Sequence, residues 1–285
     1  MKAAVCYFAY NRPEKCAISL EALTECKGIE DTPIVVIQDN YSSELDKEGV
    51  EAVKAYIDLF MKRNSSLNIE YCLWKEKAGP YISLTKGFEY TLNRYGRALR
   101  VEDDIVVRAD YLEYMNEALD FYEDNKNIFC INSFNPVYLY EKEIFLTRHG
   151  RSWGMGTWKD RFSHIKRGNI PQIVSHMDGD YLMDVYGDNP KAAYGALLGG
   201  NSLLFSEDGE IALHLATTGQ YCVCSNTSYC VNIGFDGSGA SGLEVDTVNN
   251  NYYRRKSKNI YGYDILPECE EKKMIDSIIR YLKKE

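Results

Sequence analysis

The first 134 residues alternate between short apolar runs and segments in which apolar residues recur every three or four positions. The runs predict buried strands, and the recurring positions predict helices that are apolar on one face. The expected strands are 2–9, 33–40, 67–74, 98–107 and 127–134, and the expected helices are 13–26, 48–62, 79–96 and 109–123. This alternation predicts an α/β fold in which helices flank a mostly parallel, doubly wound central sheet.

The pattern changes after residue 135, where periodicity weakens and glycine and tryptophan become frequent. We therefore divide the chain into an α/β half at 1–135, a second half of the same domain at 136–250 and a tail at 251–285. In the tail, Met274, Ile278 and Leu282 recur four residues apart. This spacing predicts an amphipathic helix that docks on the domain, with contact to a membrane surface or a second copy as the alternative.

Composition narrows the function classes. The 285-residue chain has a formal net charge of -9, which argues against nucleic acid as a partner because binding a phosphate backbone requires clustered Lys and Arg. The nine cysteines are scattered without a CxxC pair, so we predict reduced thiols in a cytosolic protein rather than a zinc site. Neither a GxxxxGK[ST] loop nor a GxGxxG turn occurs, which disfavours kinases and dehydrogenases.

Three adjacent acids, Glu102, Asp103 and Asp104, interrupt the apolar run at 98–107. Polar residues also mark the ends of the first two expected strands: Arg12 lies just after the first, and Asp39 lies in the polar end of the second. The carboxyl ends of parallel strands share one edge of a sheet, where α/β proteins bind ligands. Mg²⁺ and Mn²⁺ prefer carboxylate oxygens. The pattern therefore favours a nucleotide and metal site, and the alternative is a polar loop whose acids point to water.

Five segments carry a resemblance to a known family: FAYNRPE, VVIQDN, RALRVEDDIVVRADYLEYMNEALDFY, SWGMGTWKDRF and NIGFDGSG. In this order they resemble glycosyltransferases of the GT-A fold, which is Rossmann-like. Within that fold they look most like N-acetylglucosaminyltransferase I and bacterial sugar-transferase relatives. The resemblance covers roughly residues 2–242. It implies an inverting transfer from a nucleotide sugar, usually a UDP-sugar, with Mn²⁺ or Mg²⁺ bound at a DxD-like motif.

The resemblance also implies roles for individual residues, with donor binding in 1–135 and acceptor binding in 136–250. Asp104, the last acid of the triplet, is the expected metal ligand. The expected donor contacts are Arg12 and Asp39 for the uridine, Glu102 and Asp103 for the sugar and ribose, and Trp153 and Gly154 for the sugar pocket.

The segment expected to supply the general base departs from the family pattern. Relatives often carry an Asp in an NSWD-like segment, but no Asp follows Asn201-Ser202 in the matching segment NSLLFSEDGEIAL. Glu207 and Asp208 fall near that place, at the front of an expected helix. We expect Asp208 rather than Glu207 to be the base, because Gly209 allows close approach of the backbone. Asp236 is the alternative.

These features predict a metal-dependent hexosyltransferase that acts on a saccharide or lipid-linked saccharide acceptor in bacterial surface-polysaccharide synthesis. We expect it in the cytoplasm, at the inner face of the membrane. Two other functions stay open. One is a nucleotide-sugar- or carbohydrate-binding protein that has the fold but no turnover. The other is a nucleotidyltransferase, although AYNRPEKC lacks the glycines that such a loop needs.

Overall fold

The computed structural model describes residues 2–135, 143–147, 152–165 and 207–234. Within the last range, only some side chains of the helix are described. The expected tail helix at 251–285, the base candidate Asp236 and most of the expected acceptor half at 136–250 lie outside these residues. No described helix combines the length and the apolar character needed to cross a bilayer.

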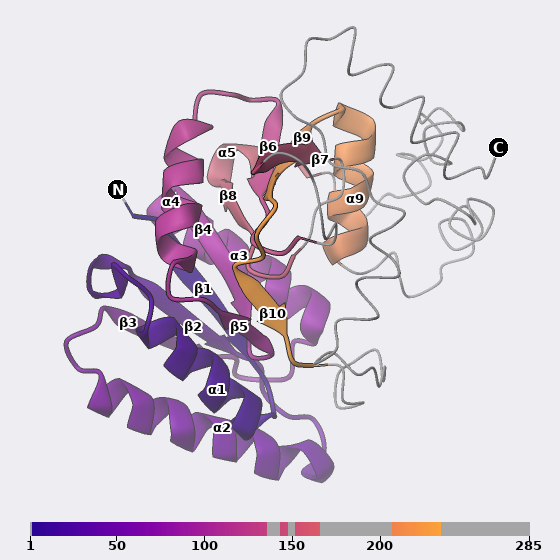
Figure 1. The fold of residues 1–285 in the computed structure, drawn as a ribbon. Helices are drawn as coiled ribbons and strands as arrows, with labels where there is room; N and C mark the ends of the chain where they lie inside the picture. Colours follow the sequence, from indigo (N-terminus) through magenta and orange to yellow (C-terminus); the bar gives the residue numbers. More distant parts are fainter. Residues whose placement is uncertain (1, 136–142, 148–151, 166–206, 235–285) are drawn as a thin grey trace, which may run out of the picture.

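The core of the protein is an eight-stranded mixed sheet (Figure 1). Its strands in spatial order are β3 (Ile69–Leu73), β2 (Ile34–Gln38), β1 (Ala4–Ala9), β4 (Arg97–Glu102), β8 (Gly156–Trp158), β6 (Ile128–Ile131), β9 (Tyr221–Ser225) and β7 (Ile144–Thr147). The first four are parallel, and only β8 and β7 run against the others. The predicted α/β fold with a mostly parallel sheet is therefore confirmed.

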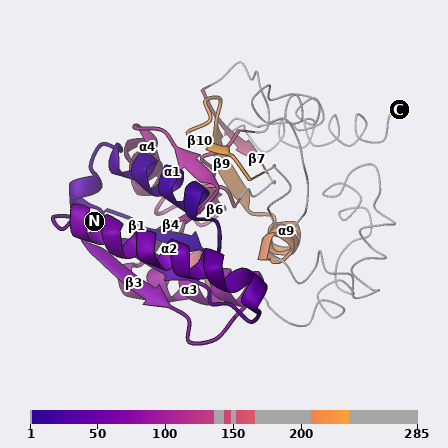
Figure 2. The same cartoon turned by 90° about the horizontal axis from the view of Figure 1, so that it is seen from below.

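Helices cover both faces of this sheet, as the views in Figures 1 and 2 show. One face packs against α1 (Pro13–Thr24), α2 (Glu44–Arg63) and α4 (Tyr111–Phe121), and the other against α3 (Pro80–Tyr95), α5 (Lys159–Phe162) and α9 (Glu207–Thr218). In β1, Val5 and Tyr7 enter the first core, whereas Cys6 and Phe8 enter the second. A central strand buried on both faces has this continuous apolar sequence.

Local signals set the ends of α3. Gly79 precedes the helix with φ of 80°, and Gly96 follows it with φ of 78°. A residue with a side chain rarely adopts such values, and Pro80 suits the first helical turn because its missing N–H has no partner there. The predicted limits of this helix, Gly79-Pro80 and Gly96, are confirmed.

One predicted strand is wrong in its extent. The run at 98–107 does not continue as a single strand through the acids. β4 ends at Glu102, residues 103 and 104 form a turn, and β5 (Ile105–Val107) pairs antiparallel with β10 (Cys230–Asn232) in a separate two-stranded sheet. The turn lets the carboxylates of Asp103 and Asp104 both reach the guanidinium of Arg12. Successive side chains of a continuous strand would instead point to opposite faces of the sheet.

Candidate functional site

The polar residues expected at one edge of the sheet do meet there. β1 lies between β2 and β4, and its last residues pair with theirs: Ala9 with Gln38 and Phe8 with Glu102. Because the three strands are parallel, the residues that follow them emerge side by side. The structure therefore brings the loop at Arg12, the residue Asp39 and the acidic turn of Asp103 and Asp104 to a common edge.

Arg12 joins the two carboxylates of the acidic turn. Its Nη2 donates to Asp104 Oδ2 at 2.9 Å and also to Asp103 Oδ1. Asp103 is 3% exposed, and this burial raises its pKa to about 6, because lost hydration outweighs the attraction of Arg12. Burial alone would lower the pKa of Arg12, but the two carboxylates outweigh it and raise that pKa above its ordinary value.

The backbone around the acidic turn is fixed by the strand pair β5–β10. Ile233 N–H donates to the carbonyl of Asp104 at 2.8 Å. Gly234 lies against the same residue, and a Cβ added to it would stand 2.2 Å from Asp104 Oδ2. Any side chain at 234 would displace this carboxylate, so the glycine leaves room for the Asp104 carboxylate in its present position.

The described residues fit a divalent cation in chemistry and in charge. Carboxylate oxygens are the donors that hard cations prefer, and Asp103 Oδ2 is buried with no hydrogen-bond partner among the described residues. Arg12 with Asp103 and Asp104 carries one net negative charge, and Arg100 with Glu102 and Glu207 carries another. The described part of the chain holds no group of three Asp, Glu, His or Cys side chains placed to hold a metal ion, so fewer than three such ligands come from these residues.

A second ion-pair network lies behind the turn, on the sheet face that α9 covers. Arg100 donates from Nη2 to Glu102 Oε1 at 2.9 Å and from Nη1 to Glu207 Oε2. The side chains of Arg100 and Glu207 are only 3% and 1% exposed. Glu207 is thus placed as a buried partner of Arg100 rather than as a carboxylate open to an acceptor hydroxyl. The side chain of Asp208, the favoured base, is outside the described ones.

Asp39 is engaged by the protein's own backbone. Its Oδ1 accepts the N–H groups of Asn40 and Ala78, and its Oδ2 accepts that of Gly79, each at 2.8 Å. The last two donors belong to the residues that lead into α3. Asp39, at 5% exposure, therefore fixes the loop between β3 and α3.

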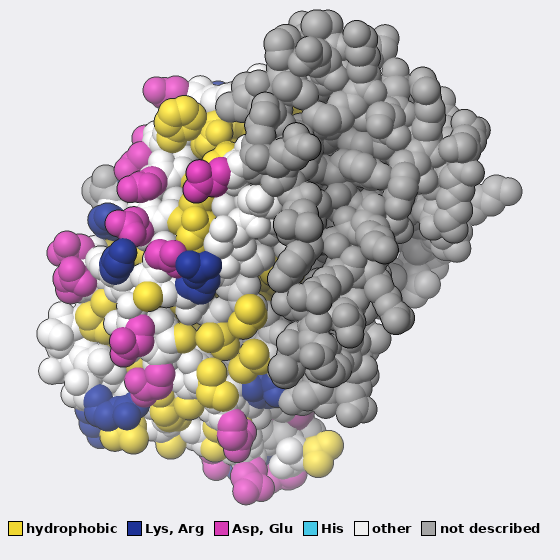
Figure 3. Space-filling model, viewed as in Figure 1, with side chains coloured by type: hydrophobic (Ala, Val, Ile, Leu, Met, Phe, Trp, Pro, Cys, Tyr) yellow, Lys and Arg dark blue, Asp and Glu magenta, His cyan; other side chains and the backbone are white. Residues whose placement is uncertain are grey.

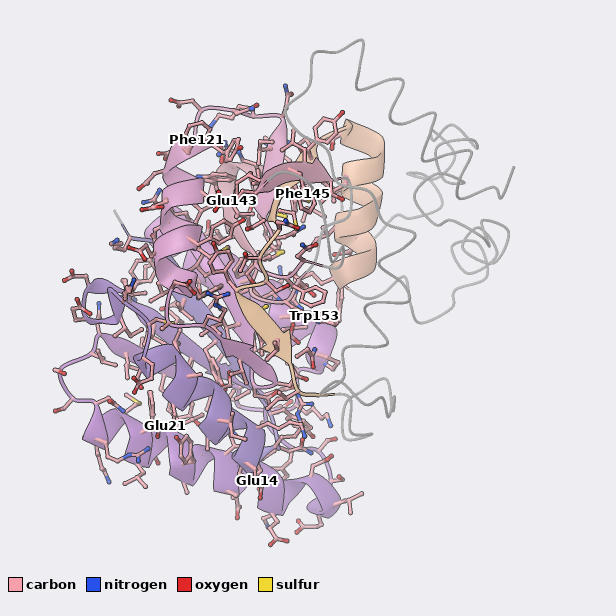
Figure 4. The ribbon with its side chains drawn as sticks, viewed as in Figure 1. Glu14, Glu21, Phe121, Glu143, Phe145 and Trp153 are labelled. Carbon is pink, nitrogen blue, oxygen red and sulfur yellow. The ribbon has the colours of Figure 1, made fainter. Side chains whose placement is uncertain are left out.

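Trp153, labelled in Figure 4, lies beside β10, where Cys230 Sγ donates to its carbonyl oxygen at 3.5 Å. Trp153 packs edge-on against Phe134, with ring centroids 4.9 Å apart, and its carbonyl accepts a hydrogen bond from Ser133 Oγ at 2.9 Å. Gly154 has φ of 66°, and Tyr111 OH donates to its carbonyl at 3.0 Å. These contacts hold the segment against the core.

Arg100 was not predicted as a site residue, although a charged residue inside an apolar run is a signal that the sequence contains. Its partner Glu207 is 107 residues away, so no local pattern joins the two.

On the described part of the face in Figure 3, basic side chains are interspersed with acidic ones and do not gather in one patch.

No protein-family model and no curated protein sequence matches the chain. Among solved structures, residues 1–349 of TarS from S. aureus in complex with UDP-GlcNAc match with 13% identity over 99% of this chain and 71% of that chain, at a TM-score of 0.50. GalNAc-T7 with UDP, GalNAc and Mn²⁺ matches with 9% identity over 81% of this chain and 43% of that chain, at a TM-score of 0.49.

A mannosyltransferase from Pyrobaculum calidifontis in complex with GDP-Man and Mn²⁺ matches with 12% identity over 47% of this chain, at a TM-score of 0.38. The match spans only 36% of that protein's length. The likeness to TarS extends over nearly the whole chain and concerns the fold alone. The protein has a GT-A fold, a large and mostly parallel central sheet flanked by helices.

Proposed function

We propose that the protein is a metal-dependent glycosyltransferase that moves a sugar from a nucleotide sugar, most simply a UDP-sugar, to a hydroxyl of a saccharide or lipid-linked saccharide. The observation that carries this proposal is the acidic turn, Asp103 and Asp104, at the carboxyl edge of a GT-A sheet. The fold likeness to a protein solved with UDP-GlcNAc adds support. We extend the proposal to an inverting reaction in cytoplasmic assembly of surface polysaccharide.

Each residue has a role in this proposal. Asp104 would hold a divalent metal, which when bound supplies positive charge for the departing diphosphate. Asp103 and Glu102 position the ribose and the sugar, and Trp153 with Gly154 forms a wall of the sugar pocket. We propose that Arg12 and Asp39 lie at the nucleotide end of the donor.

The acceptor needs a base on the face opposite the leaving group. Asp208 is our proposal for that base, since the neighbouring Glu207 is committed to Arg100. The base would take the proton of the acceptor hydroxyl while the hydroxyl oxygen attacks the anomeric carbon, the bond from that carbon to the diphosphate oxygen breaks, and the nucleoside diphosphate leaves.

The test is hydrolysis and transfer from a panel of nucleotide sugars, with and without Mn²⁺. We expect Asp104→Asn to lower metal-dependent turnover about 100-fold, because several kcal/mol of leaving-group stabilisation depend on the metal. Glu113→Gln, the same loss of charge at a half-exposed carboxylate paired with Lys27, is the control and should leave turnover unchanged. Binding of a donor without any turnover would instead indicate the binding-protein alternative, and no donor binding at all would end both.

A further inference from the structure

The contact between Arg12 and the acidic turn uses only part of the hydrogen-bonding capacity of the guanidinium and of the carboxylates. One nitrogen, Nη2, serves both Asp103 and Asp104, whereas Nη1 is buried with no hydrogen-bond partner among the described residues. Asp103 Oδ2 is buried and unpartnered in the same way. Arginine and carboxylate groups bind most strongly through two parallel hydrogen bonds. Neither carboxylate makes that paired contact here.

The two sides of this contact differ in how firmly they are held. The acids lie on a turn anchored by β4 on one side and by the β5–β10 pair on the other. Arg12 stands in the loop before α1, makes no side-chain cap to that helix, and carries a long side chain that is 19% exposed. Any rearrangement at this edge therefore falls on the guanidinium and not on the carboxylates.

The net charge around the acidic turn indicates which ligand would bind there if Arg12 moved away. The two carboxylates of the turn exceed the single guanidinium by one negative charge, and the buried network of Arg100 adds another. A divalent cation would balance this excess. However, a cation bound to Asp104 Oδ2 would stand within a few ångströms of Nη2, which contacts that same oxygen at 2.9 Å. Repulsion between the two cations would then oppose binding.

We propose that Arg12 is a built-in cation that competes with the divalent metal for Asp103 and Asp104, so that metal enters only when the guanidinium leaves the turn. This inference deepens the proposed function and rests on it for the identity of the metal. The competition accounts for the ion pair in which Arg12 balances part of the negative charge of Asp103 and Asp104. It also gives Arg12 a positioning role, because the released guanidinium is free to donate to the donor's diphosphate.

The competition is tested by titrating Mn²⁺ into the protein without any nucleotide, with calorimetry as the readout. Arg12→Gln should bind Mn²⁺ about tenfold or more tightly than wild type, since it removes a like charge a few ångströms from the metal. Arg63→Gln is the matched control, because Arg63 also forms an ion pair, with Glu21, but at a surface that is 49% exposed. That control should bind Mn²⁺ as wild type does. Adding Asp104→Asn to Arg12→Gln should abolish the gain.

Loss of Arg12 leaves two acids without their counter-charge, so Arg12→Gln is expected to melt earlier than wild type. Mn²⁺ should raise its melting temperature more than that of wild type, which makes the instability itself a readout. Arg12→Lys keeps the charge and should bind Mn²⁺ nearly as wild type does. If Arg12→Lys binds Mn²⁺ as tightly as Arg12→Gln does, the positive charge at position 12 does not oppose metal binding, and the proposal is overturned.

Further outcomes separate this inference from the proposed function. Equal Mn²⁺ affinity in wild type and Arg12→Gln, with UDP-dependent Mn²⁺ binding intact, would overturn the competition and leave the glycosyltransferase proposal standing. Tighter Mn²⁺ binding by Arg12→Gln in a protein that binds no nucleotide sugar would support the competition and remove the proposed function. If no variant binds Mn²⁺ under any condition, while UDP binding requires Arg12, the guanidinium replaces the metal and the competition is overturned.

Discussion

Glu207→Gln separates a structural role of this residue from a catalytic one. The substitution keeps the shape of the side chain and removes its charge from a pair in which both partners are at most 3% exposed. Breaking a buried ion pair costs about 3–5 kcal/mol, because the remaining charge stays buried. Arg100 retains Glu102 as a partner, so we expect the lower end, about 3 kcal/mol. A protein of this size then melts about 6 °C or more below wild type.

The assay is equilibrium unfolding in urea, followed by tryptophan fluorescence, together with turnover on the active donor. Glu113→Gln should change the free energy of unfolding by less than about 0.5 kcal/mol, since exposed pairs contribute little. A double variant, Arg100→Met with Glu207→Leu, should recover part of the lost stability, because the one charge that loses its Arg100 partner, Glu102, is 27% exposed and can be hydrated. A Glu207→Gln protein with wild-type stability and turnover lowered about 100-fold would refute this reasoning and make Glu207 the base.

Three further predictions concern single side chains. Asp39→Asn should lower the free energy of unfolding by about 2 kcal/mol, because an amide cannot accept three backbone N–H groups; a loss of UDP affinity without loss of stability would contradict this. Burial lowers the pKa of His214 below its ordinary 6.5, so the unfolded chain binds the proton more tightly and stability should fall as the pH drops below about 6.5. The His214→Gln variant, compared in urea melts at pH 7.5 and 5.5, should lack that part of the pH dependence; an equal pH dependence in both proteins would argue against it. Gly154→Ala should destabilise by at least about 1–2 kcal/mol, measured by thermal melting, since φ is 66° and a Cβ would stand 2.2 Å from Ser133 Oγ; an unchanged melting temperature would refute it.

Much of the first half could be predicted from the sequence because its signals are local. Apolar periodicity located β1, β2, β3, α1, α2 and α3 to within a few residues, and the Gly79-Pro80 and Gly96 punctuation located the ends of α3. The meeting of Arg12, Asp39 and the acids followed from parallel order alone. The break between β4 and β5 was missed, because two apolar runs separated by charges have the same periodicity whether the strand continues or turns.

Local patterns along the chain are enough to predict which residues reach the edge of the sheet, since strand direction and strand ends depend on local pattern and backbone chemistry. What those residues contact there depends on packing between distant segments. The tertiary structure inserted β8 between β4 and β6, joined Arg12 to Asp103 and Asp104 across about 90 residues of sequence, and buried Glu207 against Arg100. The physical reason is that a buried charge takes whichever opposite charge the packing brings within reach, and no local pattern along the chain specifies that partner.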